Sequence, residues 1–166
     1  LPIFKLIKEI MNEYSTIQKY IIENFDIYVN DLNKMINNNK NIKELTYDEL
    51  CNYNLEKSTI ESKTAFFVMS LKYKLIEDTM LHNLLCNLFE DFIERIKIKE
   101  YSDISTDILN LIQIVLKNGK DYLEQSYKNK IIEYIDDILK IDRKENPGYN
   151  QKSKFILMDL QTLLKK

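Results

Sequence analysis

The sequence predicts an all-α protein, and three observations lead to this class. The 166-residue chain contains only two glycines and two prolines, whereas strands joined by tight turns need such residues about every eight to twelve positions. Apolar residues recur at intervals of three and four along almost the whole chain, which is the period of an amphipathic helix. Hydrophobic residues make up 45% and charged residues 30% of the chain, enough for a buried core. We therefore expect one helical domain over residues 1–166.

The first part of the chain contains two amphipathic stretches that we expect to pair as helices over residues 3–38. The asparagine-rich stretch 37–41 ends this pair. A short helix is expected after Thr46, inside a connection that runs to Lys57. Asparagine-rich stretches of this kind are interpreted as loop or insertion before they are interpreted as binding sites.

A second pair of helices is expected over residues 58–97. Ser58 is suited to the N-cap position, and Glu61 follows three residues later, as in a capping box. The apolar stripe of this helix continues to Leu75, and Asp78 is expected to cap the second helix of the pair.

A third pair is expected over residues 103–141, with Gly119 ending its first helix. A loop over residues 142–150 precedes a closing helix over residues 151–165, in which Phe155 is assigned to the core together with Leu157. The pairs recur about every 40–45 residues, which matches helical repeats. We therefore expect HEAT-type antiparallel helix pairs stacked as a short right-handed solenoid, with a plain helical bundle as the alternative.

Charge and cysteine content limit the function. The chain has 24 basic and 26 acidic side chains, which excludes a strongly basic protein that wraps nucleic acid. Residues 97–166 nevertheless carry a net charge of +2. Cys51 and Cys86 are too few for a disulfide framework and suit a reducing, cytoplasmic location. No run approaches the roughly 18–20 apolar residues of a membrane span, so no membrane partner is expected. Because the chain begins inside an apolar pattern without Met, we expect a fragment of a larger protein.

Enzyme signatures are nearly absent. His82 and Cys86 are four residues apart and share one face of a predicted helix. This pair could supply a nucleophile and its base or half of a zinc site, or it could be a histidine beside a buried thiol. Adjacent carboxylates such as Asp136 and Asp137 are expected on a solvated face. We expect no enzyme activity, no cofactor, no metal and no small-molecule substrate.

The basic loop over residues 142–150 is the candidate RNA contact. Arg143 and Lys144 supply positive charge, and Tyr149 is the tyrosine that we expect to be exposed beside them. Exposed aromatic rings next to cations can stack on bases. Direct RNA binding through this basic third of the chain is therefore an alternative function.

Four segments of the second half occur in an order that is typical of one known family. The segment AFFVMSLKYKLIEDTMLHNLL begins at Ala65, and DILNLIQIVLKNGKDYLEQ (107–125) contains a Gly-Lys-Asp turn. IIEYIDDILK follows, and the chain closes with KSKFILMDLQTLLKK, in which two lysines stand where the family has arginines. In these features the chain resembles the middle domain of eukaryotic translation initiation factor 4 gamma over about residues 65–166.

This resemblance implies a non-catalytic HEAT-type scaffold in translation initiation that holds a DEAD-box RNA helicase of the factor 4A type. Some relatives also bind RNA, so the resemblance implies mRNA as a second possible partner of this chain. On this basis we expect partner contacts at Lys120 and Asp121 in the turn and at Lys152, Lys154 and Asp159 in the closing helix. Relatives with the same domain act in mRNA decay, splicing or regulation of poly(A)-binding protein, and these functions stay open. A helical structural module without such a partner is a further alternative.

Overall fold

The computed structural model describes residues 2–11, 15–37 and 41–165. Within these ranges all regular elements are helical, which confirms the predicted all-α class. The helices are α1 (Pro2–Met11), α2 (Ser15–Ile36), η1 (Ile42–Glu44), α3 (Tyr47–Lys72), α4 (Asp78–Arg95), η2 (Lys99–Tyr101), α5 (Ser102–Gly119), η3 (Lys120–Tyr122), α6 (Gln125–Leu139) and α7 (Gln151–Leu164). None of the described helices has the length and apolar character that a membrane span needs. Residues 12–14 and 38–40, which belong to the predicted pair 3–38 and its asparagine-rich end, lie outside the described residues.

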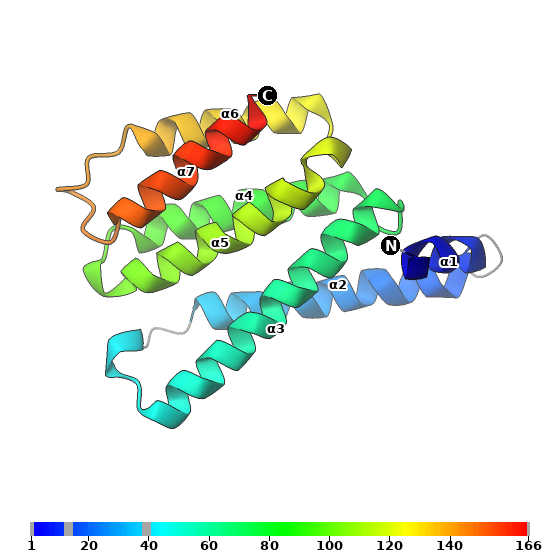
Figure 1. Cartoon of the computed structure of the whole chain (residues 1–166), viewed down its shortest axis with the longest axis horizontal. Coiled ribbons are helices and arrows are strands. Elements are labelled where there is room, and N and C mark those ends of the chain that lie inside the picture. Colours follow the sequence, from blue (N-terminus) through cyan, green and yellow to red (C-terminus); the bar gives the residue numbers. More distant parts are fainter. Residues whose placement is uncertain (1, 12–14, 38–40, 166) are drawn as a thin grey trace.

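Consecutive helices from α2 to α7 alternate in direction (Figure 1). Helix α5 is central and packs against α3, α4 and α7, while α6 packs against α4 and α7. In the view of Figure 1, α3, α5 and α7 lie in front, and α2, α4 and α6 lie behind them. Helix α1 packs on α2 at the N-terminal end.

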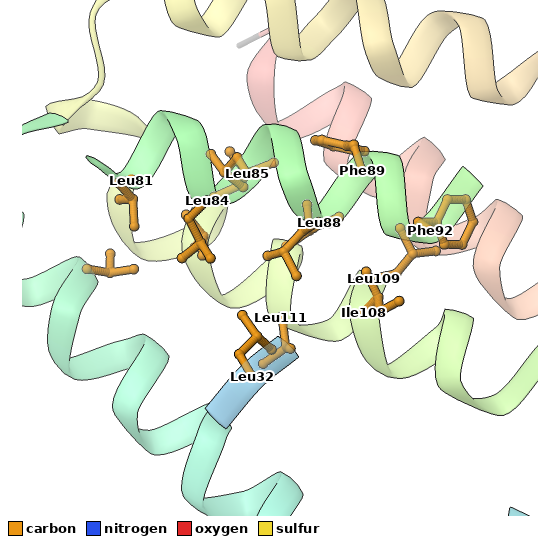
Figure 2. Packing of buried hydrophobic residues seen from close by; sticks show 14 of the residues in the cluster. Leu32, Leu81, Leu84, Leu85, Leu88, Phe89, Phe92, Ile108, Leu109 and Leu111 are labelled. Atoms are coloured by element: carbon orange, nitrogen blue, oxygen red, sulfur yellow. The ribbon is translucent and has the colours of Figure 1, made fainter. Parts of the chain in front are cut away.

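The core runs continuously from α1 to α7 and consists mainly of leucine, isoleucine and aromatic side chains. Figure 2 shows its middle, where Leu84 and Leu88 of α4 approach Leu32 of α2 and Leu111 of α5. All four are at least 96% buried. Burying each such side chain contributes roughly 1.5–3 kcal/mol to folding, so the apolar stripes of these helices bring the elements together.

Helix α3 is a single helix from Tyr47 to Lys72, so the predicted new helix start at Ser58 is wrong. Its N-terminus is Thr46, where the backbone N–H of Glu49 donates to the Thr46 hydroxyl at 3.4 Å and the Glu49 carboxylate accepts from the Thr46 N–H at 3.0 Å. Ser58 lies inside the helix, and its carbonyl accepts a hydrogen bond from the Ser62 hydroxyl. The capping box exists, but at Thr46 rather than at Ser58.

A buried polar cluster joins the first half of α3 to α5. The Tyr53 hydroxyl donates to Asp107 Oδ2 at 2.7 Å, and the Lys57 ammonium donates to the other carboxylate oxygen. Tyr53 and Lys57 are four residues apart and therefore project from one face of α3 toward α5. Burial, with the Asp107 carboxylate beside it, raises the pKa of Tyr53 far above its usual value. The residue pattern does not predict this cluster, because its partners are about 50 residues apart in the chain.

Two further predicted helix ends can be compared with the structure. Helix α5 ends at Gly119 as predicted, but the backbone there is right-handed. The reason for glycine is close packing, because a Cβ would lie 3.0 Å from Val68 Cγ1 of α3. Asp78 is the first residue of α4 rather than its cap, since Glu77 occupies the N-cap position without a side-chain bond.

Candidate functional site

The outer face of α7 is the candidate site, because it combines exposed apolar and charged side chains. Phe155 is 56% exposed and Met158 is 45% exposed. Lys152, Asp159 and Thr162 are also exposed on this helix. We call these five residues the α7 surface. Large apolar side chains surrounded by polar ones are typical of a protein-docking site.

The predicted burial of Phe155 is wrong, whereas that of Leu157 is confirmed. Helix α7 buries Ile156, Leu157 and Leu160 where it packs against α5 and α6. Successive residues of a helix point about 100° apart, so Phe155 lies nearly opposite the centre of this buried stripe. The helical period, applied residue by residue, was the signal that could have placed Phe155 outside.

Asn150 fixes the start of α7 on α5. Its side-chain oxygen accepts from the backbone N–H of Ser153 at 2.8 Å, which caps the helix. Its side-chain nitrogen donates to the Ser102 hydroxyl at 2.8 Å and to the Thr106 hydroxyl at 3.0 Å. The α7 surface is therefore presented by a helix whose N-terminus is held in place.

Asp136 of α6 fixes the other end of α7. Its carboxylate accepts from the Gln161 side chain and from the Lys165 ammonium, and these interactions hold its pKa below the usual range. The neighbouring Asp137 accepts from Lys140 at 2.8 Å. These two carboxylates therefore have structural partners, and Asp136 joins α6 to α7.

The residues predicted to contact a partner at the Gly-Lys-Asp turn lie at the C-terminal end of α7. The Lys120 ammonium donates to the carbonyl of Leu163 at 3.0 Å, so this lysine connects η3 to α7. Asp121, the next residue, is exposed. Both lie away from Lys152, which is at the opposite end of the helix.

The two lysines predicted on the closing helix do not form one site. Lys152 and Lys154 are two residues apart and therefore point about 160° from each other around α7. Asp159 is seven residues beyond Lys152 and returns to the same side of the helix. The structure thus groups Lys152 with Asp159 and with the apolar pair Phe155 and Met158, while Lys154 lies on the other flank.

The three residues predicted to bind RNA do not form an exposed site. Tyr149 is 2% exposed, with its ring edge-on to Phe92, so its predicted exposure is wrong. Its hydroxyl is buried without a hydrogen-bond partner among the described residues, and burial raises its pKa. Arg143 donates to the Tyr149 carbonyl at 3.0 Å and to the Gln151 side chain, and these hydrogen bonds stabilise the loop over residues 142–150. Lys144 is exposed.

His82 and Cys86 lie together on α4, as predicted from their spacing. The Cys86 sulfur is 3.6 Å from His82 Nε2, and the histidine ring stacks on Tyr127 of α6 at 4.0 Å between centroids. Burial, followed by the nearby Lys130 charge, lowers the pKa of His82. Burial also raises the pKa of the Cys86 thiol. Both shifts favour neutral groups, which is the opposite of an activated thiolate–imidazolium pair.

Acidification is expected to destabilise the protein through His82. Its folded-state pKa lies below the unfolded value of 6.5, so the unfolded chain binds the proton more readily. The stability contributed by neutral His82 is present above about pH 6.5 and is lost as the pH falls through the folded-state pKa. Melting temperatures at about pH 7.5 and about pH 5 should show a smaller decrease for His82→Gln than for the unchanged protein. Equal decreases would show that other groups carry the pH dependence.

In the described ranges, no group of three or more His, Cys, Asp or Glu side chains converges to hold a metal ion. Comparison with protein-family models, with curated proteins and with solved structures finds no match for this chain. The similarity to the initiation-factor domain therefore stays a prediction from the quoted motifs. The candidate site rests on the geometry of α7.

Proposed function

We propose that this chain is a non-catalytic scaffold that binds a protein partner through the α7 surface, and that the partner is a DEAD-box RNA helicase of the factor 4A type. The observation that carries the proposal is the exposure of Phe155 and Met158 beside Lys152 and Asp159 on the outer face of α7. The nature of the partner follows from the resemblance of residues 65–166 to the initiation-factor domain, as do a role in translation initiation and a cytoplasmic location.

A protein partner suits the α7 surface better than RNA does. Its centre is apolar, and its two charges, Lys152 and Asp159, have opposite signs on the same flank. Nucleic-acid affinity depends on several cations that neutralise phosphates. Opposite charges around an apolar centre are instead the pattern of a protein interface, where they set the orientation of the partner.

The scaffold in this proposal is of the HEAT type. Its support is the packing of α3 on α5 and of α5 on α7, with α4 beside α6 behind them. Helix pairs in a solenoid contact their neighbours in this way. Because Asn150 and Asp136 hold both ends of α7, the α7 surface is preorganised and binding does not have to order it.

Removing the apolar centre should weaken helicase binding. We expect Phe155→Ala with Met158→Ala to raise the dissociation constant at least about tenfold, because central apolar side chains dominate interface energies. Calorimetric titration of the chain with a factor 4A-type helicase, with and without nucleotide and RNA and at two salt concentrations, measures this. The melting temperature should change little, since both side chains are exposed.

Leu55→Ala is the matched control, because Leu55 is 68% exposed on α3, away from α7. It should leave helicase affinity unchanged. Equal affinities of the α7 double variant and the Leu55 variant would contradict the assignment of the α7 surface. Saturable binding of RNA alone that disappears at moderate salt would support direct RNA binding instead.

A further inference from the structure

A groove between α2 and α4 is separate from the α7 surface and is not used by the proposed helicase contact. It has a volume of about 470 Å³. Its lining consists of four apolar and four polar side chains, namely Phe25, Val29, Met80 and Leu84, and Asp26, Asn30, Asn83 and Asn87. The apolar four are buried or partly buried, whereas the polar four are exposed. The groove therefore has an apolar floor and polar walls.

The polar walls have a regular spacing. Asp26 and Asn30 are four residues apart on α2, and Asn83 and Asn87 are four residues apart on α4. Each pair therefore projects from one face of its helix, about 6 Å apart along the axis. Neighbouring side chains on one face of an extended chain repeat about every 6.6 Å. An extended peptide lying along the groove could thus meet successive wall residues with alternate residues of its own.

The wall amides are free to bind a ligand. Among the described residues, no hydrogen-bond partner is found for the side-chain amides of Asn30, Asn83 and Asn87. Two other helical asparagines, Asn24 and Asn118, each donate instead to the carbonyl four residues earlier. An asparagine side chain carries a donor and an acceptor, as a peptide group does, so the two groups can pair through two hydrogen bonds.

The charge of the groove selects among ligands. Asp26 is the charged residue of the lining, and neither lysine nor arginine lines the groove. A phosphate-bearing ligand would meet a carboxylate and no compensating cation. A lysine or arginine of a peptide would find its counterion in Asp26.

We propose that the α2–α4 groove binds an extended peptide segment of a partner protein, with its backbone on Asn30, Asn83 and Asn87, alternate apolar side chains on the floor, and a basic residue beside Asp26. This binding goes beyond the helicase contact at α7 and does not depend on it.

Selection from a phage-displayed library of random dodecapeptides on the immobilised protein tests the proposal. Enriched peptides should combine apolar residues at alternate positions with a lysine or arginine. Synthetic copies, measured by fluorescence anisotropy, should bind Asn83→Ala/Asn87→Ala about tenfold more weakly than the unchanged protein, because two amide pairings are lost. N-methylation of alternate peptide bonds should weaken binding to the unchanged protein, and Asp26→Asn should reduce the preference for basic peptides.

Asn52→Ala/Asn54→Ala is the matched control, because these asparagines are also exposed within a helix but lie on α3 outside the groove. It should bind the enriched peptides normally. The proposal is overturned if no peptide is enriched, if the groove and control variants bind equally, or if a uridine decamer displaces the peptides.

Discussion

Replacing Gly148 by alanine should lower the free energy of unfolding by about 3 kcal/mol, the upper end of the usual cost of overpacking. The loop over residues 142–150 lies on the C-terminal end of α4, where the Gly148 N–H donates to the carbonyl of Ile96 at 2.8 Å. An added Cβ would be 2.5 Å from the carbonyl oxygen of Ile98 and 2.9 Å from that of Ile96. Backbone atoms cannot rotate away, so the loop has to move and withdraw the Tyr149 ring from the core.

Urea unfolding followed by circular dichroism measures this effect, with Gly119→Ala as the control. The Cβ added at Gly119 meets the Val68 side chain at 3.0 Å rather than backbone, and side chains can adjust. We expect a cost of about 1 kcal/mol or less there. Equal stability of the Gly148 variant and the unchanged protein would show that the loop is not held tightly on α4.

Replacing Asp107 by alanine should cost about 3 kcal/mol, because it removes one member of a largely buried ion pair. The side chain of Asp107 is 10% exposed and that of Lys57 is 27% exposed. Without the carboxylate, the Tyr53 hydroxyl loses its acceptor and the Lys57 ammonium loses its counterion. We expect the first half of α3 to open, because this cluster joins it to α5.

Hydrogen exchange measures the local effect of Asp107→Ala on amide protection. Urea unfolding measures its effect on the free energy of unfolding of the whole protein. Amides of residues 50–58 should lose protection in Asp107→Ala, while those of α5 outside the cluster keep most of theirs. Asp121→Ala, at an exposed carboxylate, should change stability by less than about 0.5 kcal/mol. Unchanged exchange in α3 would contradict the assignment of the Asp107 cluster as the attachment of this part of the helix to α5.

The sequence by itself determined the helical class and the starts of α5 and α7 to within one residue. The scarcity of glycine and proline and the spacing of apolar residues are local properties, and helix formation responds to local properties. Helix α5 was expected from residue 103 and begins at Ser102, and the closing helix was expected from residue 151 and begins at Gln151. The pairing of His82 with Cys86 also followed from spacing, because residues four apart in a helix are neighbours.

Only the tertiary structure decided which side chains are available to a partner. Tyr149 looked exposed in a basic loop, yet the approach of Gly148 to α4 places its ring in the core. Phe155 looked like core, yet α5 and α6 cover only the opposite face of α7. The polar start of α3 looked like a connection, yet Asp107 gives it a partner on α5. For Tyr149 and for the start of α3 the outcome depends on contacts between distant parts of the chain, and residue type and local period carry no record of those contacts. For Phe155 the helical period pointed away from Leu157, and the packing of α7 on α5 and α6 decided which of the two faces is covered.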